Sequence, residues 1–183
     1  AVLVETAQDL LQAKASINGA RRAFAATGIK LPLFVQVTVE TTGTMLLGSE
    51  IGAALTALEP LDIDLIGLNC ATGPAEMSEH LRHLSRHARG GWAGRPKAGR
   101  PELTADGARY PLSPEELADA HDSFTREFGL SLVGGCCGTT PEHLRQVVQR
   151  VGGQAITPRR PHPDRGAASL YQHVPFRQDT TYL

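Results

Sequence analysis

The sequence of 183 residues has an ordinary globular composition, with 41% hydrophobic and 20% charged residues. Its net charge of −1 offers no broad basic field for nucleic acid. No apolar run approaches the roughly 20 residues that span a bilayer, and residues 1–6 lack the features of a signal peptide. Three cysteines are too few for a disulfide framework, so we expect reduced thiols in a cytoplasmic protein that binds neither nucleic acid nor membrane.

Short apolar runs alternate with longer amphipathic segments along the chain. In chain order the pattern predicts a strand at 2–4, a helix at 10–26, a strand at 33–39, a helix at 49–58, a strand at 65–68, helices at 76–87 and 113–128, a strand at 130–133 and a helix at 140–151. Such alternation is typical of parallel strands joined by helices. Four clear strand–helix units and one doubtful one predict an α/β fold that forms part of a barrel, because a full eight-unit barrel needs about 200 residues or more.

The doubtful unit lies at residues 89–101, where a strand is due between two predicted helices. The segment reads R-G-G-W-A-G-R-P-K-A-G-R-P, and its glycines and prolines predict a loop with Trp92 as an anchor.

The preceding predicted helix carries three histidines on one face, His80, His83 and His87. Arginines lie among them, which indicates a solvated basic face.

The end of the chain has no periodic pattern. Residues 1–153 are predicted to form the barrel unit, and residues 154–183 are predicted to form a linker that wraps around it or leaves it. Arg159 and Arg160, which lie between prolines, are expected to be exposed in this linker.

All three cysteines follow predicted strands. Cys70 comes after the strand at 65–68, and Cys136 and Cys137 lie in V-G-G-C-C-G-T-T-P after the strand at 130–133. The carboxyl ends of parallel strands carry the chemistry of α/β folds, and zinc binds thiolates readily. Three thiolates with an open fourth position would suit a substrate that is itself a thiol, because zinc lowers a thiol's pKa. The spacing alone leaves simple burial of two small thiols equally open.

Three stretches resemble known proteins. Glu5-Thr6, G-L-N-C-A-T-G-P at 67–74 and G-G-C-C-G-T-T-P-E-H-L at 134–144 are similar to the zinc-dependent homocysteine S-methyltransferases, in particular the homocysteine-binding domain of cobalamin-dependent methionine synthases. The resemblance covers residues 1–88 and 102–151. It implies a (β/α)8 barrel of which the fourth to eighth strand–helix units are present and the first three are missing.

The resemblance also implies a mechanism. The family's zinc ligands fall on Cys70, Cys136 and Cys137, and homocysteine sulfur takes the open position as a thiolate. Glu5 matches the acidic residue that meets the substrate's amino group, and Asn69 is expected to hydrogen-bond the substrate or a ligand. The methyl donor implied is methylcobalamin on another module, with methionine as product. The tail at 169–183 looks like the connector to a folate-binding module, so cobalamin and folate modules are the expected partners.

Two alternatives remain open from the sequence. One is a single-domain enzyme that uses a betaine or sulfonium donor. The other is an inactive, truncated remnant, because Lys97 stands where the family has an asparagine and an ammonium group there would repel a metal ion. Either Lys97 points away from the site or the site is impaired. A barrel without its first three units would also leave open sheet edges, so we expect an unstable or self-associating chain.

Overall fold

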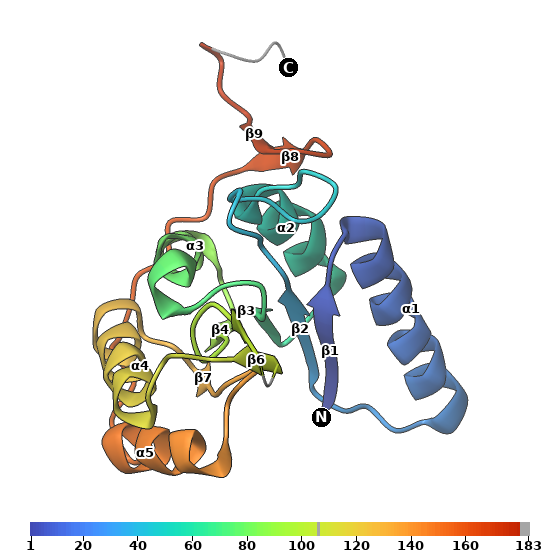
Figure 1. The fold of residues 1–183 in the computed structure, drawn as a ribbon. Coiled ribbons are helices and arrows are strands. Elements are labelled where there is room, and N and C mark those ends of the chain that lie inside the picture. The colour runs from blue at the N-terminus through green and yellow to red at the C-terminus, as the bar shows by residue number, and fades with distance from the viewer. Residues whose placement is uncertain (106, 180–183) are drawn as a thin grey trace.

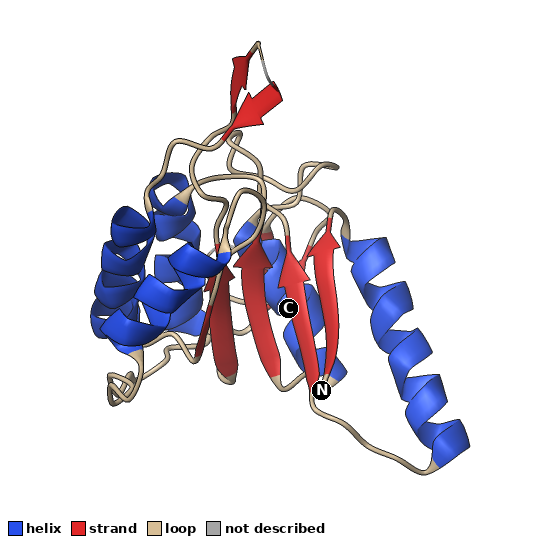
Figure 2. Ribbon diagram, turned by 60° about the horizontal axis from the view of Figure 1, so that its bottom comes forward, coloured by secondary structure: helices blue, strands red, loops and turns tan. Residues whose placement is uncertain are grey.

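The computed structural model of the chain describes residues 1–105 and 107–179, in which helices pack around one main sheet (Figure 1). The sheet is parallel and has the strand order β1-β2-β3-β4-β7. Its strands are β1 (Val2–Ala7), β2 (Leu33–Val37), β3 (Leu65–Asn69), β4 (Gly91–Arg95) and β7 (Leu132–Val133). Figure 2 shows the long arrows of this sheet pointing the same way. All carboxyl ends of these strands therefore lie at one edge, where loops can bring distant residues together.

The helices alternate with the strands along the chain and lie within one or two residues of their predicted positions. They are α1 (Leu10–Thr27), α2 (Ile51–Leu58), α3 (Pro74–His87), α4 (Pro114–Phe128) and α5 (Pro141–Val151), and a 3-10 turn spans Glu59–Leu61. Gly28 ends α1 in the left-handed conformation (φ 70°), and its N–H donates to the Phe24 carbonyl at 2.9 Å. Ser113 and Glu116 form a reciprocal capping box at the start of α4.

The prediction of a loop at 89–101 is wrong, because this segment contains β4. The strand lies between β3 and β7 and pairs with both. Trp92 is fully buried and packs against Phe128, with ring centroids 6.5 Å apart, so it is a core residue and not a loop anchor. At Gly94 an added Cβ would lie 3.0 Å from a Leu130 methyl carbon. Neighbouring side chains fill the space beside this strand, which is why it carries glycine where apolar residues would be expected.

The buried core lies between the sheet and the helices. Its largest members are side chains from β2, β3, β4 and the inner faces of α1 to α4, among them Ile17, Val35, Leu68, Leu81 and Trp92. The structure confirms the α/β class and the strand–helix alternation, which are compatible with part of a (β/α)8 barrel. The barrel itself stays a prediction. Within the described part of the chain, no helix is long and apolar enough to cross a membrane.

Two short hairpins lie outside the main sheet. One joins β5 (Glu102–Thr104) to β6 (Gly107–Arg109). The other joins β8 (Gly166–Ala168) to β9 (His173–Pro175) and packs on α2 (Figure 1). Ser49 holds this second hairpin by donating to the Leu170 carbonyl at 2.6 Å.

The tail runs back along the helices before it reaches that hairpin. Arg159 donates to the carbonyl groups of Ser85 (3.0 Å) and Ala88 (2.7 Å), and its guanidinium lies 5.4 Å from the Trp92 ring centroid. The expectation that Arg159 is exposed is therefore wrong, whereas Arg160 is exposed. The division into residues 1–153 and 154–183 stays a prediction, and its last residues, 180–183, lie outside the described part.

Candidate metal centre

The three cysteines come together at the carboxyl edge of the sheet. Their Sγ atoms all lie within 4.8 Å of one another, and those of Cys70 and Cys137 are 3.6 Å apart. Cys70 directly follows β3, and Cys136 and Cys137 follow β7, with β4 between these two strands. Cys137 is exposed and the other two are partly exposed. Simple burial of small thiols therefore does not describe this cluster.

Backbone hydrogen bonds to the end of β4 fix both cysteine loops. The N–H of Cys70 donates to the Arg95 carbonyl (3.1 Å), and the N–H of Cys136 donates to the Pro96 carbonyl (3.0 Å). Cys70 and Ala71 both have positive φ angles, 64° and 55°, which non-glycine residues rarely adopt. Such strain is held only where surrounding contacts enforce it, and it is frequent at functional sites.

Glycines flank the cysteine pair for steric reasons. Gly138 has a φ of 78°, and a Cβ there would overlap the Tyr110 ring. At Gly135 a Cβ would overlap Thr139. The backbone can therefore make the tight turn that presents two successive thiols only if these positions lack side chains.

The thiols of the cluster differ in their acidity. Burial raises the pKa of the Cys70 thiol to about 11. Burial also acts to raise the pKa of Cys137, but hydrogen bonds from Cys70 and Cys136 and the charge of Lys97 outweigh it, and the pKa of Cys137 falls below its usual value. Among these two thiols, Cys137 therefore holds negative charge more easily.

Lys97 lies within electrostatic range of the cluster, since its charge acts on Cys137. Its backbone N–H donates to the Thr72 carbonyl at 3.0 Å, which places it on the loop after β4. The two possibilities raised by the sequence, that Lys97 points away or that the site is impaired, both stay predictions. The ammonium stabilises a thiolate, and by the same charge it opposes a bound cation.

Asn69 links the cluster to β1. It is 1% exposed; its Oδ1 accepts from the Thr6 N–H, and its Nδ2 donates to Thr6 Oγ1, both at 2.8 Å. Nδ2 also lies 3.7 Å from the Cys136 sulfur. Thr6 itself has a φ of 54°, so this amide holds a strained residue in place beside a candidate ligand.

Glu5 is half exposed at the mouth of the site and forms an ion pair that the sequence did not predict. Its Oε2 lies 2.7 Å from Nη1 of Arg95, which also donates to Oε1 of the fully buried Gln36 at 3.1 Å. Arg95 was missed because its strand was taken for a loop. Gln36 had a signal, since it interrupts the apolar strand L-F-V-Q-V.

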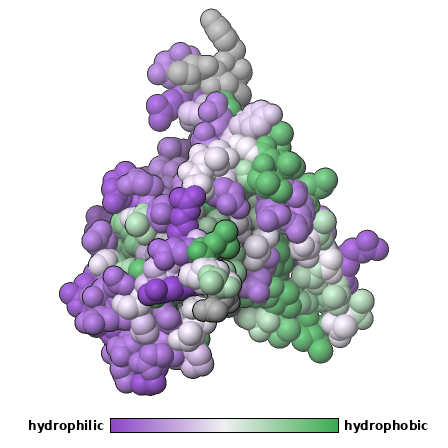
Figure 3. Space-filling view, viewed as in Figure 1, coloured by the Kyte–Doolittle hydropathy of each residue, from purple (hydrophilic) through white to green (hydrophobic). Residues whose placement is uncertain are grey.

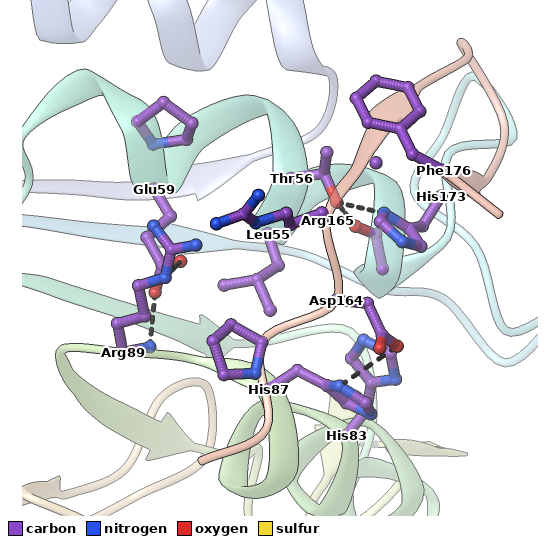
Figure 4. Close-up of a pocket in the computed structure, with 14 residues that line it drawn as sticks. Leu55, Thr56, Glu59, His83, His87, Arg89, Asp164, Arg165, His173 and Phe176 are labelled. Atoms are coloured by element: carbon purple, nitrogen blue, oxygen red, sulfur yellow. Dashed lines mark hydrogen bonds and ion pairs between the residues drawn. The ribbon is translucent and has the colours of Figure 1, made fainter. Parts of the chain in front are cut away.

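A separate cavity of about 420 Å³ lies between α2, α3 and the tail (Figure 4). His83, His87 and His173 line it, and none of the cysteines does. Burial, followed by the charges of His87 and His173, lowers the pKa of His83 to about 4. The interpretation of a solvated face is therefore wrong for His83 and His87. The chemistry of the donor atoms makes the cysteine cluster, not this cavity, the candidate active centre.

The donor set fits a zinc ion. Three sulfur ligands that converge from one side, with the exposed Cys137 open to solvent, match the arrangement of three protein ligands and one exchangeable position found in catalytic zinc sites. Asn69 beside Cys136 and the backbone bonds to Cys70 and Cys136 would fix the ligands from outside.

Comparison with known proteins places the chain among related sequences. It is 62% identical over 183 residues to the methionine synthase of Mycobacterium tuberculosis (strain ATCC 25618 / H37Rv), covering 100% of this chain and 15% of the relative. It is 60% identical over 188 residues to the methionine synthase of Mycobacterium leprae (strain TN), of which it covers 16%. The chain thus spans only a small part of these relatives.

A family profile agrees with these similarities. The profile of homocysteine S-methyltransferase matches residues 1–151, which include the three cysteines, Glu5 and Asn69. The chain therefore belongs to the homocysteine S-methyltransferase family.

Proposed function

We propose that the chain is part of a methyltransferase domain that binds homocysteine at a zinc ion held by Cys70, Cys136 and Cys137. The observation that carries the proposal is the convergence of three sulfur atoms, from two loops far apart in the chain, within 4.8 Å of one another. When bound, zinc would lower the pKa of a coordinated substrate thiol and keep it as a thiolate nucleophile at neutral pH.

The chain's own residues have distinct tasks in this proposal. The three cysteines bind the ion on one side and leave an open position toward solvent. Asn69 orients Cys136 and holds the strained Thr6. Glu5, at the end of β1, binds the ammonium group of homocysteine, because a carboxylate at the site mouth gives a charge-assisted hydrogen bond. These contacts would direct the substrate sulfur to the incoming methyl group.

The methyl donor that we propose is methylcobalamin on another module of a longer, cytoplasmic enzyme that yields methionine. The family profile ends at residue 151, yet the similarity to methionine synthases continues through the whole chain. This continuation supports a tail that leads toward a further module, the folate-binding one in our proposal. It favours the modular enzyme over a single-domain enzyme with a betaine or sulfonium donor.

Zinc titration against a chromophoric chelator tests the proposal. The chain should bind one zinc ion, and Cys136→Ser should weaken binding by roughly a hundredfold or more, because a thiolate ligand is lost. Met45→Leu, which removes a buried sulfur elsewhere, serves as the control and should bind zinc normally. Normal zinc binding by Cys136→Ser would refute the ligand assignment, and a chain without zinc affinity would be an inactive remnant.

Homocysteine binding tests the role of Glu5. Glu5→Gln should retain one zinc ion and bind L-homocysteine roughly tenfold or more weakly, since an ion pair with the ammonium group is lost. Calorimetry on the zinc-loaded chain measures both quantities. Unchanged affinity for homocysteine would show that Glu5 does not contact the substrate.

A further inference from the structure

Arg95 occupies the centre of the candidate site. It is the last residue of β4 and pairs with Asn69 on β3, so it lies between the two loops that carry the cysteines. Its carbonyl accepts from the Cys70 N–H at 3.1 Å, and its Nε donates to the Gly135 carbonyl at 3.3 Å, directly before Cys136. The guanidinium therefore has a fixed position beside the sulfur cluster.

Two donor groups in this region lack a hydrogen-bond partner within the described residues. Arg95 Nη1 donates to Glu5 and Gln36, whereas Nη2 has no hydrogen-bond partner among residues 1–105 and 107–179. The amide nitrogen of Gln36 is buried and likewise without a partner in the described part of the chain. Gln36 Oε1 accepts from the guanidinium and is bonded to the same carbon atom as Nε2. The Nε2 donor of Gln36 therefore lies close to the Nη2 donor of Arg95. A buried unpaired donor is costly, and an acceptor oxygen from a ligand would satisfy it.

The charges of Arg95 and Glu5 are complementary to those of an α-amino acid. Its ammonium and carboxylate groups are attached to one carbon atom, and here a carboxylate and a guanidinium lie 2.7 Å apart. Arg95 can offer the N–H groups of Nη2 to a carboxylate beside the amide nitrogen of Gln36, and its side chain is 23% exposed, so its charge is both accessible and partly shielded from water. The sulfur cluster lies beside this pair, as a thiol-bearing side chain would require.

We propose that Arg95, together with Gln36, binds the carboxylate of the amino-acid thiol and makes the site specific for zwitterionic substrates. This inference rests on the proposed function, in which the substrate sulfur meets the cysteine cluster and Glu5 meets the ammonium group. An ion pair that only neutralises Glu5 would instead hinder substrate binding, and removal of Arg95 would then improve it.

Three thiols separate the contributions of the two charged groups. L-homocysteine carries both groups, 4-mercaptobutanoate lacks the amino group, and 3-aminopropane-1-thiol lacks the carboxylate. In the zinc-loaded chain, Arg95→Met should weaken the binding of L-homocysteine and of 4-mercaptobutanoate by roughly tenfold or more. It should leave the affinity for 3-aminopropane-1-thiol unchanged. Arg95→Lys keeps the charge without the planar guanidinium, and should weaken binding of the same two thiols by a smaller factor.

Arg126→Met is the matched control, because it removes an exposed guanidinium on α4 whose partner is Asp122. It should change none of the three affinities.

Three results would overturn the inference while the proposed function stands, provided that the thiols bind the unsubstituted chain. In these, Arg95→Met weakens binding of all three thiols alike, strengthens binding of homocysteine, or changes no affinity. If Arg95→Met does not fold, Arg95→Lys decides by the same pattern. If no thiol binds the unsubstituted chain, the proposed function and this inference both fail.

Discussion

Gly67 shows how closely single residues constrain the centre of the sheet. It lies on β3 opposite Ala93 of β4, where an added Cβ would come within 2.7 Å of both the Ala93 Cβ and its carbonyl oxygen. Backbone atoms cannot move aside as a flexible side chain can. Strand β4, which carries Arg95 at its end, is therefore held at this distance from β3 only because residue 67 lacks a side chain.

Gly67→Ala should lower the free energy of unfolding by about 1–3 kcal/mol, as overpacking does in other cores. Gly19→Ala is the matched control, because Gly19 lies in α1 with nothing within 4 Å of its added Cβ. That change should raise the free energy of unfolding by about 0.5–1 kcal/mol. Urea denaturation of both variants measures the effect, and equal stabilities would contradict the close approach of β3 and β4.

The sequence predicted the cysteines as neighbours because each follows a strand with a clear apolar pattern, and the family resemblance added Glu5 and Asn69. The structure brings the three sulfur atoms together with Asn69 beside Cys136, and Glu5 contacts Arg95. The roles of these residues as ligands and substrate contacts stay predictions. Arg95 was missed because its strand was taken for a loop. Gln36 had a local signal as a polar residue within an apolar strand, but its contact with Arg95 depends on side chains that meet across the sheet.

Elements with strong local signals were predictable. The capping residues Ser113 and Thr140 and the terminal Gly28 determine helix ends through bonds within a few residues. Strand β4 lacks such signals. Its glycines are explained by long-range packing against β3, Leu81 and Leu130, and composition alone therefore indicated a loop.

His121 gives α4 a dependence on pH. Its side chain is 0% exposed, and its Nε2 lies 2.7 Å from the carbonyl oxygen of Gly134, which precedes the cysteine turn. Burial lowers its pKa to about 4, although the carbonyl of Gly134 acts in the opposite direction. Because the folded-state pKa lies below the value of 6.5 for a free histidine, the unfolded state binds more protons at intermediate pH.

The contribution of neutral, buried His121 to the free energy of unfolding is thus fully present above pH about 6.5. It is lost as the pH falls toward 4. The loss amounts to roughly 3 kcal/mol for a shift of this size. His121→Gln, which keeps a hydrogen-bond donor without titrating, should flatten the fall in unfolding free energy between pH 6.5 and 4. His162→Gln, at an exposed position, is the control. An unchanged pH profile in His121→Gln would show that another group governs acid stability.

The main sheet has open edges in the described part of the molecule. Strands β1 and β7 each have a single neighbour in the sheet there. Hydrophobic residues gather on the side that carries β1 and α1 (Figure 3), including the exposed Leu3, Leu11, Ile29 and Leu31. Unpaired strand edges with apolar side chains favour pairing with other chains.

We expect the chain to associate with itself as its concentration rises. Leu3→Lys, at a position that is 42% exposed on β1, should reduce association, because edge lysines oppose strand pairing. Leu103→Lys, at the 93% exposed position on β5, should have little effect. Sedimentation velocity over a range of concentrations measures this, and a chain that stays monomeric throughout would contradict the expectation.

The central claim is that three cysteines hold one zinc ion with a position open to a thiol. X-ray absorption at the zinc edge of the stoichiometrically loaded chain tests it most directly. We expect three sulfur neighbours at about 2.3 Å and one lighter atom, with four sulfur neighbours after L-homocysteine is added. A shell of nitrogen and oxygen alone, or a sulfur count that homocysteine leaves unchanged, would contradict it.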